Sequence, residues 1–328
     1  MANGNHKKLY LLTLDLGEKV EYLRHVGITT PDPHSSFFKD IQTDLKKNLQ
    51  TALPSDVSVE AISMADLSDD ILAKAVRIAG DKLLIASTCP EIANPVKGKT
   101  IQVNRIVDFE GNSLGLGPRP GSRSIHEQVV AIKKAAENQP IVIVEDGMFH
   151  GGTMEFIIEE LVKHGVKVDS VVVGFTFPES QPTIKSIVDR GIAFHSIEEF
   201  HNLLDWVPDH DFFPFVPSNG KVVGMKIKGD YLPFYSVDQA SLSIPYLYGF
   251  CDMPEWTSLG NEPARVFTTA CIRAAISLFM ELERLTGKEI RATDLIHSKQ
   301  RVSVPIATTQ QMLPRADVRV VSYLSEIL

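Results

Sequence analysis

The sequence predicts an α/β protein in which a parallel sheet, covered by helices, occupies the first two thirds of the chain. Short apolar runs alternate with stretches of helical period from Leu9 to about Trp206. The run Ile141–Val144 is apolar without alternation, as expected of a strand buried on both faces. Strands that alternate with helices in this way form parallel sheets with right-handed crossovers.

Each expected strand is a short run rich in β-branched and other apolar residues. These runs occupy residues 9–14, 57–62, 83–86, 100–109, 141–144 and 171–175. Each expected helix carries apolar residues three or four positions apart, so that one face of the helix is buried. The expected helices occupy residues 38–49, 67–79, 125–136, 154–162 and 184–188.

A segment rich in glycine and proline interrupts the alternation at residues 111–123. It reads Gly-Asn-Ser-Leu-Gly-Leu-Gly-Pro-Arg-Pro-Gly-Ser-Arg, which predicts neither a helix nor a strand. A loop of this length inside a compact domain is usually functional or disordered. We expect a loop whose only cations are Arg119 and Arg123.

The alternating pattern ends near Val207. The next segment, 208–220, contains three prolines and has no usable period. Beyond it, 222–227 is strand-like, and a long amphipathic helix is expected from Pro263 to Leu285. We therefore expect an α/β domain over residues 1–206 and an appended α+β region over residues 207–328.

The bulk composition limits the function classes. A net charge of −8 disfavours a surface built for nucleic acid but allows a local basic pocket. No apolar run approaches the roughly 20 residues of a membrane-spanning helix, and the N-terminus lacks the apolar stretch of a signal peptide. The three cysteines are scattered and odd in number, which excludes a disulfide framework. The sequence thus predicts a cytoplasmic protein without membrane contacts.

The segment after the strand at 141–144 carries the clearest chemistry. Glu145 and Asp146 end the strand, a four-residue turn follows, and Gly151-Gly152-Thr153 opens a helix. Ligands of open α/β sheets bind beyond the carboxyl ends of the strands. The two glycines allow backbone N–H groups to approach a phosphate, and the helix N-terminus adds its dipole.

The adjacent carboxylates distinguish this loop from a simple phosphate-binding loop. Two carboxylates repel a phosphate, but they accept hydrogen bonds from neighbouring sugar hydroxyls. Glu145 and Asp146 beside a phosphate-binding turn therefore predict a ribose 5-phosphate ligand.

This stretch resembles the phosphoribosyl-diphosphate signature of type I phosphoribosyltransferases. That signature is an apolar strand, two acidic residues, a four-residue turn, and then Gly-Gly-Thr or Gly-Gly-Ser opening a helix. Residues 191–200 (Gly-Ile-Ala-Phe-His-Ser-Ile-Glu-Glu-Phe) are similar to the strand and helix that close the core sheet of orotate phosphoribosyltransferase-like members. The resemblance covers roughly residues 80–205 and does not extend beyond Val207.

The resemblance implies a fold, a reaction and a set of site residues. It implies a parallel-sheet core in which diphosphate of phosphoribosyl diphosphate is displaced by a nitrogen nucleophile such as a nucleobase, a step of nucleotide metabolism. Magnesium would enter with the substrate, near the acidic pair and without a dedicated protein ligand. The implied catalytic residues are Glu145, Asp146, Arg119 and Arg123; the implied substrate-binding residues are Gly147, Met148, Phe149, His150, Gly151, Gly152, Thr153, Ser87 and Thr88.

The sequence also departs from the family pattern. Phe149 and His150 stand where the family usually has hydroxyl residues, which removes side-chain ligands of the phosphate. Ser87-Thr88-Cys89-Pro90 is the best candidate for the diphosphate loop. These departures keep a second hypothesis open, a non-catalytic protein that binds a nucleotide or phosphoribosyl diphosphate. A third is an unrelated α/β enzyme of nucleotides or sugar phosphates. A homodimer, and a protein partner bound through residues 207–328, are also left open.

Overall fold

The computed structural model describes the chain in two compact units. It describes residues 7–80, 84–89, 92, 98–108, 112–120, 122–218, 220–227, 230–233, 242–296, 302–303 and 318–328. Unit 1 comprises Met1–Ile62, Asn104–Gly115 and Leu204–Leu328. Unit 2 comprises Ser63–Val103 and Leu116–Leu203.

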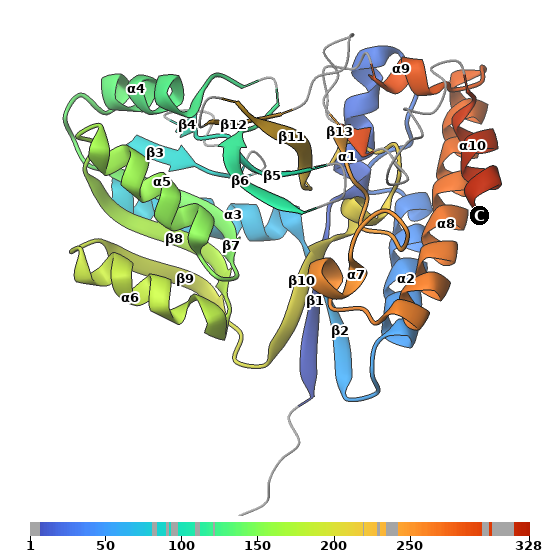
Figure 1. Ribbon diagram of the computed structural model, residues 1–328, viewed down its shortest axis with the longest axis horizontal. Coiled ribbons are helices and arrows are strands. Elements are labelled where there is room, and N and C mark those ends of the chain that lie inside the picture. The colour runs from blue at the N-terminus through green and yellow to red at the C-terminus, as the bar shows by residue number, and fades with distance from the viewer. Residues whose placement is uncertain are drawn as a thin grey trace, which may run out of the picture. The chain divides into compact units, whose positions relative to one another are not determined.

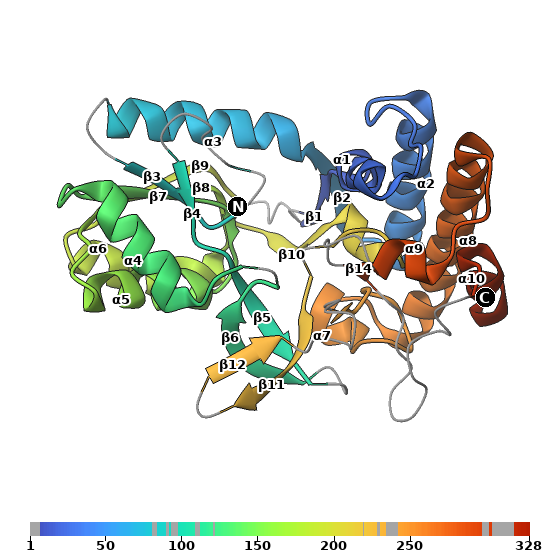
Figure 2. The same ribbon diagram turned by 90° about the horizontal axis from the view of Figure 1, so that it is seen from above.

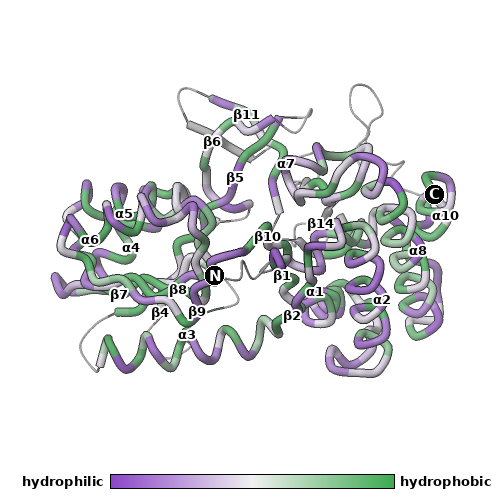
Figure 3. The backbone as a smooth tube through the Cα atoms, turned by 90° about the horizontal axis from the view of Figure 1, so that it is seen from below, coloured by the Kyte–Doolittle hydropathy of each residue, from purple (hydrophilic) through white to green (hydrophobic). Residues whose placement is uncertain are grey.

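Unit 2 is built on a parallel five-stranded sheet with the strand order β4-β3-β7-β8-β9 (Figure 1). Its strands are β3 (Leu84–Ser87), β4 (Gly98–Thr100), β7 (Ile141–Met148), β8 (Val168–Thr176) and β9 (Ala193–Glu199). Residues Ile141–Val144 are fully buried, and Figure 3 colours β7 and β8 as largely hydrophobic. The sequence prediction of a parallel α/β sheet is confirmed.

Helices cover both faces of this sheet (Figure 2). α3 (Met64–Ala79) lies on one face, and α4 (Ile125–Ala136), α5 (Gly152–Lys163) and α6 (Gln181–Asp189) lie on the other. A short 3-10 turn, η2 (Pro178–Ser180), directly precedes α6. The packing is close at Gly174 of β8. A Cβ atom there would lie 2.8 Å from Leu67 Cδ1 and 3.0 Å from Ile71 Cδ1, so α3 sits directly on the strand.

Unit 1 combines two small sheets with a group of helices. One sheet has the order β10-β1-β2, and the other has the order β14-β13-β11-β5-β6, with β12 on β11. The strands are β1 (Lys8–Leu14), β2 (Val57–Ser63), β5 (Val103–Val107), β6 (Ser113–Pro118), β10 (Leu203–Pro208), β11 (Val222–Ile227), β12 (Asp230–Pro233), β13 (Leu242–Ser243) and β14 (Val302–Ser303). The helices are α1 (Leu16–Glu21), η1 (Tyr22–Val26), α2 (Ser36–Ala52), η3 (Asp209–Phe212), α7 (Met253–Thr257), α8 (Asn261–Thr286), α9 (Ala292–Ile296) and α10 (Val320–Ile327).

The helices of unit 1 share one apolar core. α8 contacts both α2 and α10, and it buries Phe267, Cys271, Leu278 and Leu282, the stripe that the sequence predicts. Glu283 near the end of α8 binds Arg319 just before α10, with Nε at 2.9 Å from Oε1. The C-terminal helix is thereby fixed to the long helix.

The structure divides the chain differently from the expected boundary at 206/207. Unit 1 does begin again at Leu204, but residues 1–62 also belong to it. The reason is strand pairing: β10 pairs with β1, and β1 pairs with β2, in a sheet separate from that of unit 2. Local periodicity identifies a strand but does not identify the sheet that it joins.

Two further expectations are corrected. The segment 111–123 contains strand β6, because residues 113–118 pair with β5 despite their glycines. After β9 no helix follows: the chain passes through residues 200–202 directly into β10. The likeness of 191–200 to a strand and helix therefore holds only for the strand.

Candidate functional site

The acidic pair lies at the carboxyl end of β7, in the middle of the sheet of unit 2. β7 pairs with β3 on one side and β8 on the other. Glu145 and Asp146 are half-buried, whereas Val144 before them is fully buried. The sheet thus delivers two carboxylates to the edge where ligands of parallel sheets bind.

The end of β3 contacts both carboxylates. Thr88 donates from its backbone N–H to Val144 O at 3.0 Å, and its Oγ1 lies 2.9 Å from the same oxygen. The Thr88 hydroxyl also hydrogen-bonds the Glu145 carboxylate. Cys89 Sγ donates to Asp146 Oδ2 at 3.5 Å. The predicted diphosphate segment, residues 87–90, therefore contacts the acidic pair through the side chains of Thr88 and Cys89.

Ser87 and Pro90, the other members of that segment, have different positions. The Ser87 hydroxyl is buried and hydrogen-bonds the carbonyl of Cys89, which shapes the backbone after β3. Pro90 lies outside the described residues. Ser87 thus has an internal partner in this structure, and its contact with a ligand stays a prediction.

Charge repulsion is strong at this edge. Burial, and next the neighbouring Asp146 carboxylate, raise the pKa of Glu145 well above its usual range. The Thr88 hydroxyl acts in the opposite direction, because it hydrogen-bonds the charged form. Glu145 therefore holds its proton to a higher pH than a solvated glutamate does. A cation or a row of hydroxyl donors at this edge would favour the ionised form.

The helix begins at the glycine pair, as the sequence predicts. Gly151 is the N-cap of α5 with φ of 85°, and Gly152 is its first residue. At Gly151 a Cβ atom would lie 2.6 Å from Thr183 Cγ2, so only glycine fits. At Gly152 no heavy atom outside the helix's own backbone lies within 4 Å of an added Cβ, so a side chain would have room there. Thr153 is half-buried in this first turn.

The turn before the helix is held by aromatic packing and by α6. The ring centroids of Phe149 and Phe177 are 4.3 Å apart, and Met148 is buried. The carbonyl of His150 accepts a hydrogen bond from Thr183 Oγ1 at 2.8 Å, while its side chain is exposed. Phe149 thus replaces a family hydroxyl with a packing contact, and the exposed imidazole of His150 lies 4.5 Å from the Phe149 ring between centroids.

Gly147 fixes the strand end next to the turn. A Cβ atom there would lie 2.3 Å from Phe175 Cε2 on β8. The Gly147 N–H also donates to Asp146 Oδ1 at 2.7 Å, which orients that carboxylate. The backbone between the acidic pair and the turn is therefore packed closely against β8.

The two predicted cations lie on another segment, between β6 and α4. Arg119 is half-buried, and its backbone N–H donates to Gln102 O at 2.8 Å. Arg123 is exposed, and its carbonyl accepts from Gln128 Nε2 at 2.7 Å. Backbone hydrogen bonds therefore order both positions in this structure. Their contact with a diphosphate stays a prediction.

One group of side chains at this edge has the donor atoms of a metal site. Donor atoms of Cys89, Glu145 and Asp146 lie within 4.8 Å of one another. Magnesium prefers oxygen ligands, so the two carboxylates fit it and the Cys89 thiol does not. This agrees with a magnesium ion that reaches the site with most of its ligands from substrate and water.

A second cluster, in unit 1, was not predicted from the sequence. His210 hydrogen-bonds Asp15 through Nδ1, and its Nε2 lies 3.4 Å from Asp211 Oδ1. Asp209 accepts from the Asp15 N–H at 3.0 Å, and Lys19 Nζ lies 3.7 Å from Asp15. All five residues are buried, and hydrogen bonds or ion pairs connect them to one another. The Asp-His-Asp string at 209–211 is the only sequence signal of this cluster.

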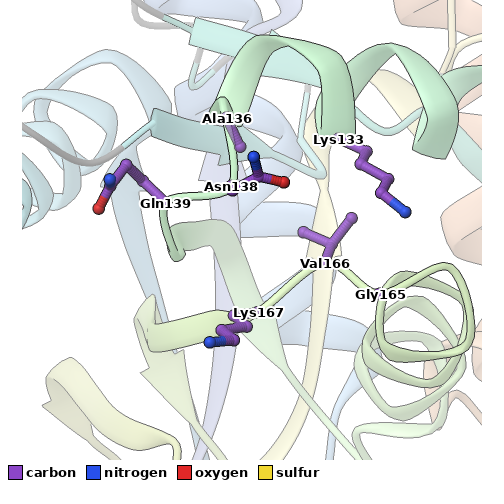
Figure 4. A pocket seen from close by; sticks show the side chains of 7 residues that line it. All are labelled: Lys133, Ala136, Asn138, Gln139, Gly165, Val166 and Lys167. Carbon is purple, nitrogen blue, oxygen red and sulfur yellow. The ribbon is translucent and has the colours of Figure 1, made fainter.

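A pocket of about 230 Å³ lies elsewhere on unit 2 (Figure 4). Lys133, Asn138, Gly165, Val166 and Lys167 are among its lining residues. Lys167 precedes β8 and accepts a backbone hydrogen bond from Ile141, the first residue of β7. The pocket is therefore at the amino ends of the strands, opposite the acidic pair.

The described part of the chain has no helix with both the length and the apolar character needed to cross a membrane. All three cysteines are free thiols, as expected, so no disulfide constrains either unit.

Comparison with known proteins gives only distant structural similarity. The sequence matches no family model and no curated protein. Adenine phosphoribosyltransferase from Thermoanaerobacter pseudethanolicus is 20% identical with a TM-score of 0.27, over 41% of this chain and 79% of that one. Orotate phosphoribosyltransferase from Mycobacterium tuberculosis, in complex with inorganic phosphate, is 11% identical with a TM-score of 0.24, over 56% and 95%. A protein from Thermus thermophilus is 16% identical with a TM-score of 0.24, over 42% and 81%. These values are too low to support a statement about activity.

Proposed function

We propose that unit 2 binds phosphoribosyl diphosphate and transfers its ribosyl phosphate to a nitrogen nucleophile. The observation that carries the proposal is local. Two half-buried carboxylates lie in the second half of β7, and helix α5 begins at Gly152, six residues after Asp146. Carboxylates suit the ribose hydroxyls, and the free N–H groups of a helix N-terminus suit the 5-phosphate.

Different residues contact the ribose, the 5-phosphate and the diphosphate in this proposal. Glu145 and Asp146 hold the 2′- and 3′-hydroxyls, which orients the ribose ring. The backbone from Met148 to Thr153 holds the 5-phosphate. Bond cleavage develops positive charge on the ring, so catalysis depends on electrostatic stabilisation and on a dry site rather than on a protein nucleophile. Arg119 and Arg123 are the proposed partners of the leaving diphosphate.

Magnesium supplies charge neutralisation of the diphosphate when it is bound. The residues present fit such an ion, because Glu145 and Asp146 add two oxygen ligands and repel each other without a cation. The raised pKa of Glu145 further predicts that magnesium binding displaces a proton. Affinity for the cation should therefore rise with pH.

A second candidate function is binding without catalysis. Phe149 packs on Phe177 where the family has a hydroxyl, and the Thr88 hydroxyl bonds Glu145. The first feature removes a side-chain ligand of the 5-phosphate, and the second engages a hydroxyl of the candidate diphosphate segment. Both favour a protein that binds its ligand without transferring the ribosyl phosphate. Such a protein would sense a nucleotide or phosphoribosyl diphosphate and signal through unit 1.

One assay separates the two functions. The protein is incubated with magnesium, phosphoribosyl diphosphate and pooled nucleobases, and released diphosphate is measured. Release that disappears in Asp146→Asn but persists in Asp189→Asn supports the transferase, because Asp189 is an exposed carboxylate at the end of α6. Saturable binding without release supports the sensor. Binding that survives loss of both Glu145 and Asp146 rejects the ribose assignment.

A further inference from the structure

Two basic side chains lie near each other in unit 1, Arg105 on β5 and Lys221 immediately before β11. β5 and β11 are parallel and pair at Ile106 and Val222, the residues that follow Arg105 and Lys221. Side chains in register on adjacent parallel strands point to the same face. The Lys221 carbonyl accepts from Ser243 Oγ at 3.0 Å, so its backbone is fixed.

The ammonium group of Lys221 packs against the aromatic ring of Trp256. Its Nζ lies 3.3 Å from the ring centroid of Trp256, which is buried in the core of unit 1. The ring of Tyr246 packs edge-on against Trp256 at 5.2 Å between centroids. Lys221 itself is half-buried, whereas Arg105 is exposed. The pair therefore lies at the edge of the core of unit 1, with Arg105 exposed to solvent.

Among the described residues, neither cation has an ionic partner in direct contact. Across that part of the chain, no carboxylate lies within 4.0 Å of Lys221 Nζ or of the Arg105 guanidinium, and no acceptor hydrogen-bonds either group. Asp205 and Glu255 act on Lys221 only from a greater distance. Partly buried charges are normally paired, and two adjacent like charges oppose each other. An oxyanion between the two side chains would relieve this repulsion.

We propose that Arg105 and Lys221 form a binding site for the oxyanion of a small molecule, a phosphoryl or carboxylate group, against the wall of Trp256. The guanidinium offers two parallel N–H donors to such a group, and the ammonium offers a point charge. This site rests on no part of the function proposed for unit 2.

The protonation of Lys221 gives the site a pH dependence. Burial first, and then the Arg105 charge, lower the pKa of Lys221 to about 7. Glu255, Cys251 and Asp205 oppose this shift. Burial raises the pKa of Asp205 to about 6, so Asp205 becomes an anion over the same range. Binding of acetate, whose charge is constant over this range, should therefore weaken as the pH rises from 6 to 8.

The test uses Trp256 as a built-in probe. The sequence has two tryptophans, so Trp206→Phe in the full chain leaves Trp256 as the only tryptophan. Its fluorescence is followed while inorganic phosphate or acetate is added, with sodium chloride at matched ionic strength as the control. We expect a saturable change with phosphate, acetate or both, which identifies the preferred oxyanion, and no saturable change with chloride.

Two substitutions and a control decide the assignment. Arg105→Gln and Lys221→Gln should each weaken binding about tenfold or more, since each removes a charged hydrogen bond. Lys226→Gln, at an exposed lysine on β11, should leave the affinity unchanged. Calorimetry of each variant in the Trp206-containing chain checks the result without the fluorescence probe. The proposal is overturned if phosphate and acetate act no differently from chloride, or if binding persists in Arg105→Gln and Lys221→Gln.

Discussion

The hydroxyl of Thr88, at the end of β3, hydrogen-bonds the carboxylate of Glu145, near the end of β7. This contact joins two segments that are 57 residues apart in sequence. It favours the ionised form of Glu145, whereas burial and the Asp146 carboxylate raise the pKa of Glu145 and have the larger effect. The residue after β3 thus limits the rise in the pKa of Glu145.

Replacement of Thr88 tests how much this hydrogen bond to Glu145 contributes to stability. Thr88→Val removes the hydroxyl but keeps the shape, which leaves the half-buried Glu145 without a donor. We expect a loss of about 1–3 kcal/mol in the free energy of unfolding. Thr88→Ser keeps the donor and should lose less than about 1 kcal/mol. Denaturant titration measures both, and equal losses in the two variants would show that the hydroxyl is unimportant.

Glu145 should make stability depend on pH. The pKa of Glu145 in the folded protein is raised above the usual value of about 4.3, so the folded state favours the protonated form more than the unfolded state does. That contribution is fully present below about pH 4 and is lost as the pH rises through the folded pKa. Glu145→Gln removes the cost of ionisation. The melting temperature of the variant relative to the parent should increase from pH 4 to pH 8, and a constant difference would contradict the shift.

The two glycines at the start of α5 should respond differently to alanine. Gly151→Ala places a Cβ at φ of 85° and against Thr183, so we expect a loss of about 2 kcal/mol or more. Gly152→Ala meets no heavy atom within 4 Å and should keep or raise stability. If a phosphate binds beside Gly152, the added methyl group of Gly152→Ala should still weaken binding of ribose 5-phosphate. Thermal melts and calorimetry separate the two effects.

Asp205 in unit 1 should also be sensitive to pH. Burial raises its pKa to about 6, so the fold loses stability as this carboxyl ionises between about pH 4 and pH 7. Asp205→Asn keeps an acceptor for the Trp206 N–H and removes the charge. We expect the variant to be more stable than the parent at pH 7.5, by an amount on the order of 1 kcal/mol, and no more stable at pH 4. A greater advantage at pH 4 would contradict this assignment.

The sequence was most informative where a local pattern has one structural solution. An unbroken apolar run at 141–144 followed by two acids and Gly151-Gly152 predicts a buried strand, its exposed end and a helix start. The buried strand and the helix start are present at those residues, but the strand continues past the half-buried acidic pair to the buried Met148. The stripes of α3 and α8 were predicted for the same reason, since period alone defines a helix face.

Features that depend on tertiary pairing were not predicted. β6 forms from a segment rich in glycine because β5 offers its backbone groups. β1 and β2 join β10 rather than the sheet of unit 2, which no local pattern reveals. The contact of Cys89 with Asp146 and the cluster around His210 likewise arise from residues distant in sequence.

The most direct test of the ribose assignment is calorimetric titration with ribose 5-phosphate and magnesium. We predict saturable binding to the parent, a loss of about tenfold or more in Asp146→Asn, and unchanged binding in Asp189→Asn. Equal affinities of the parent and Asp146→Asn would contradict the account.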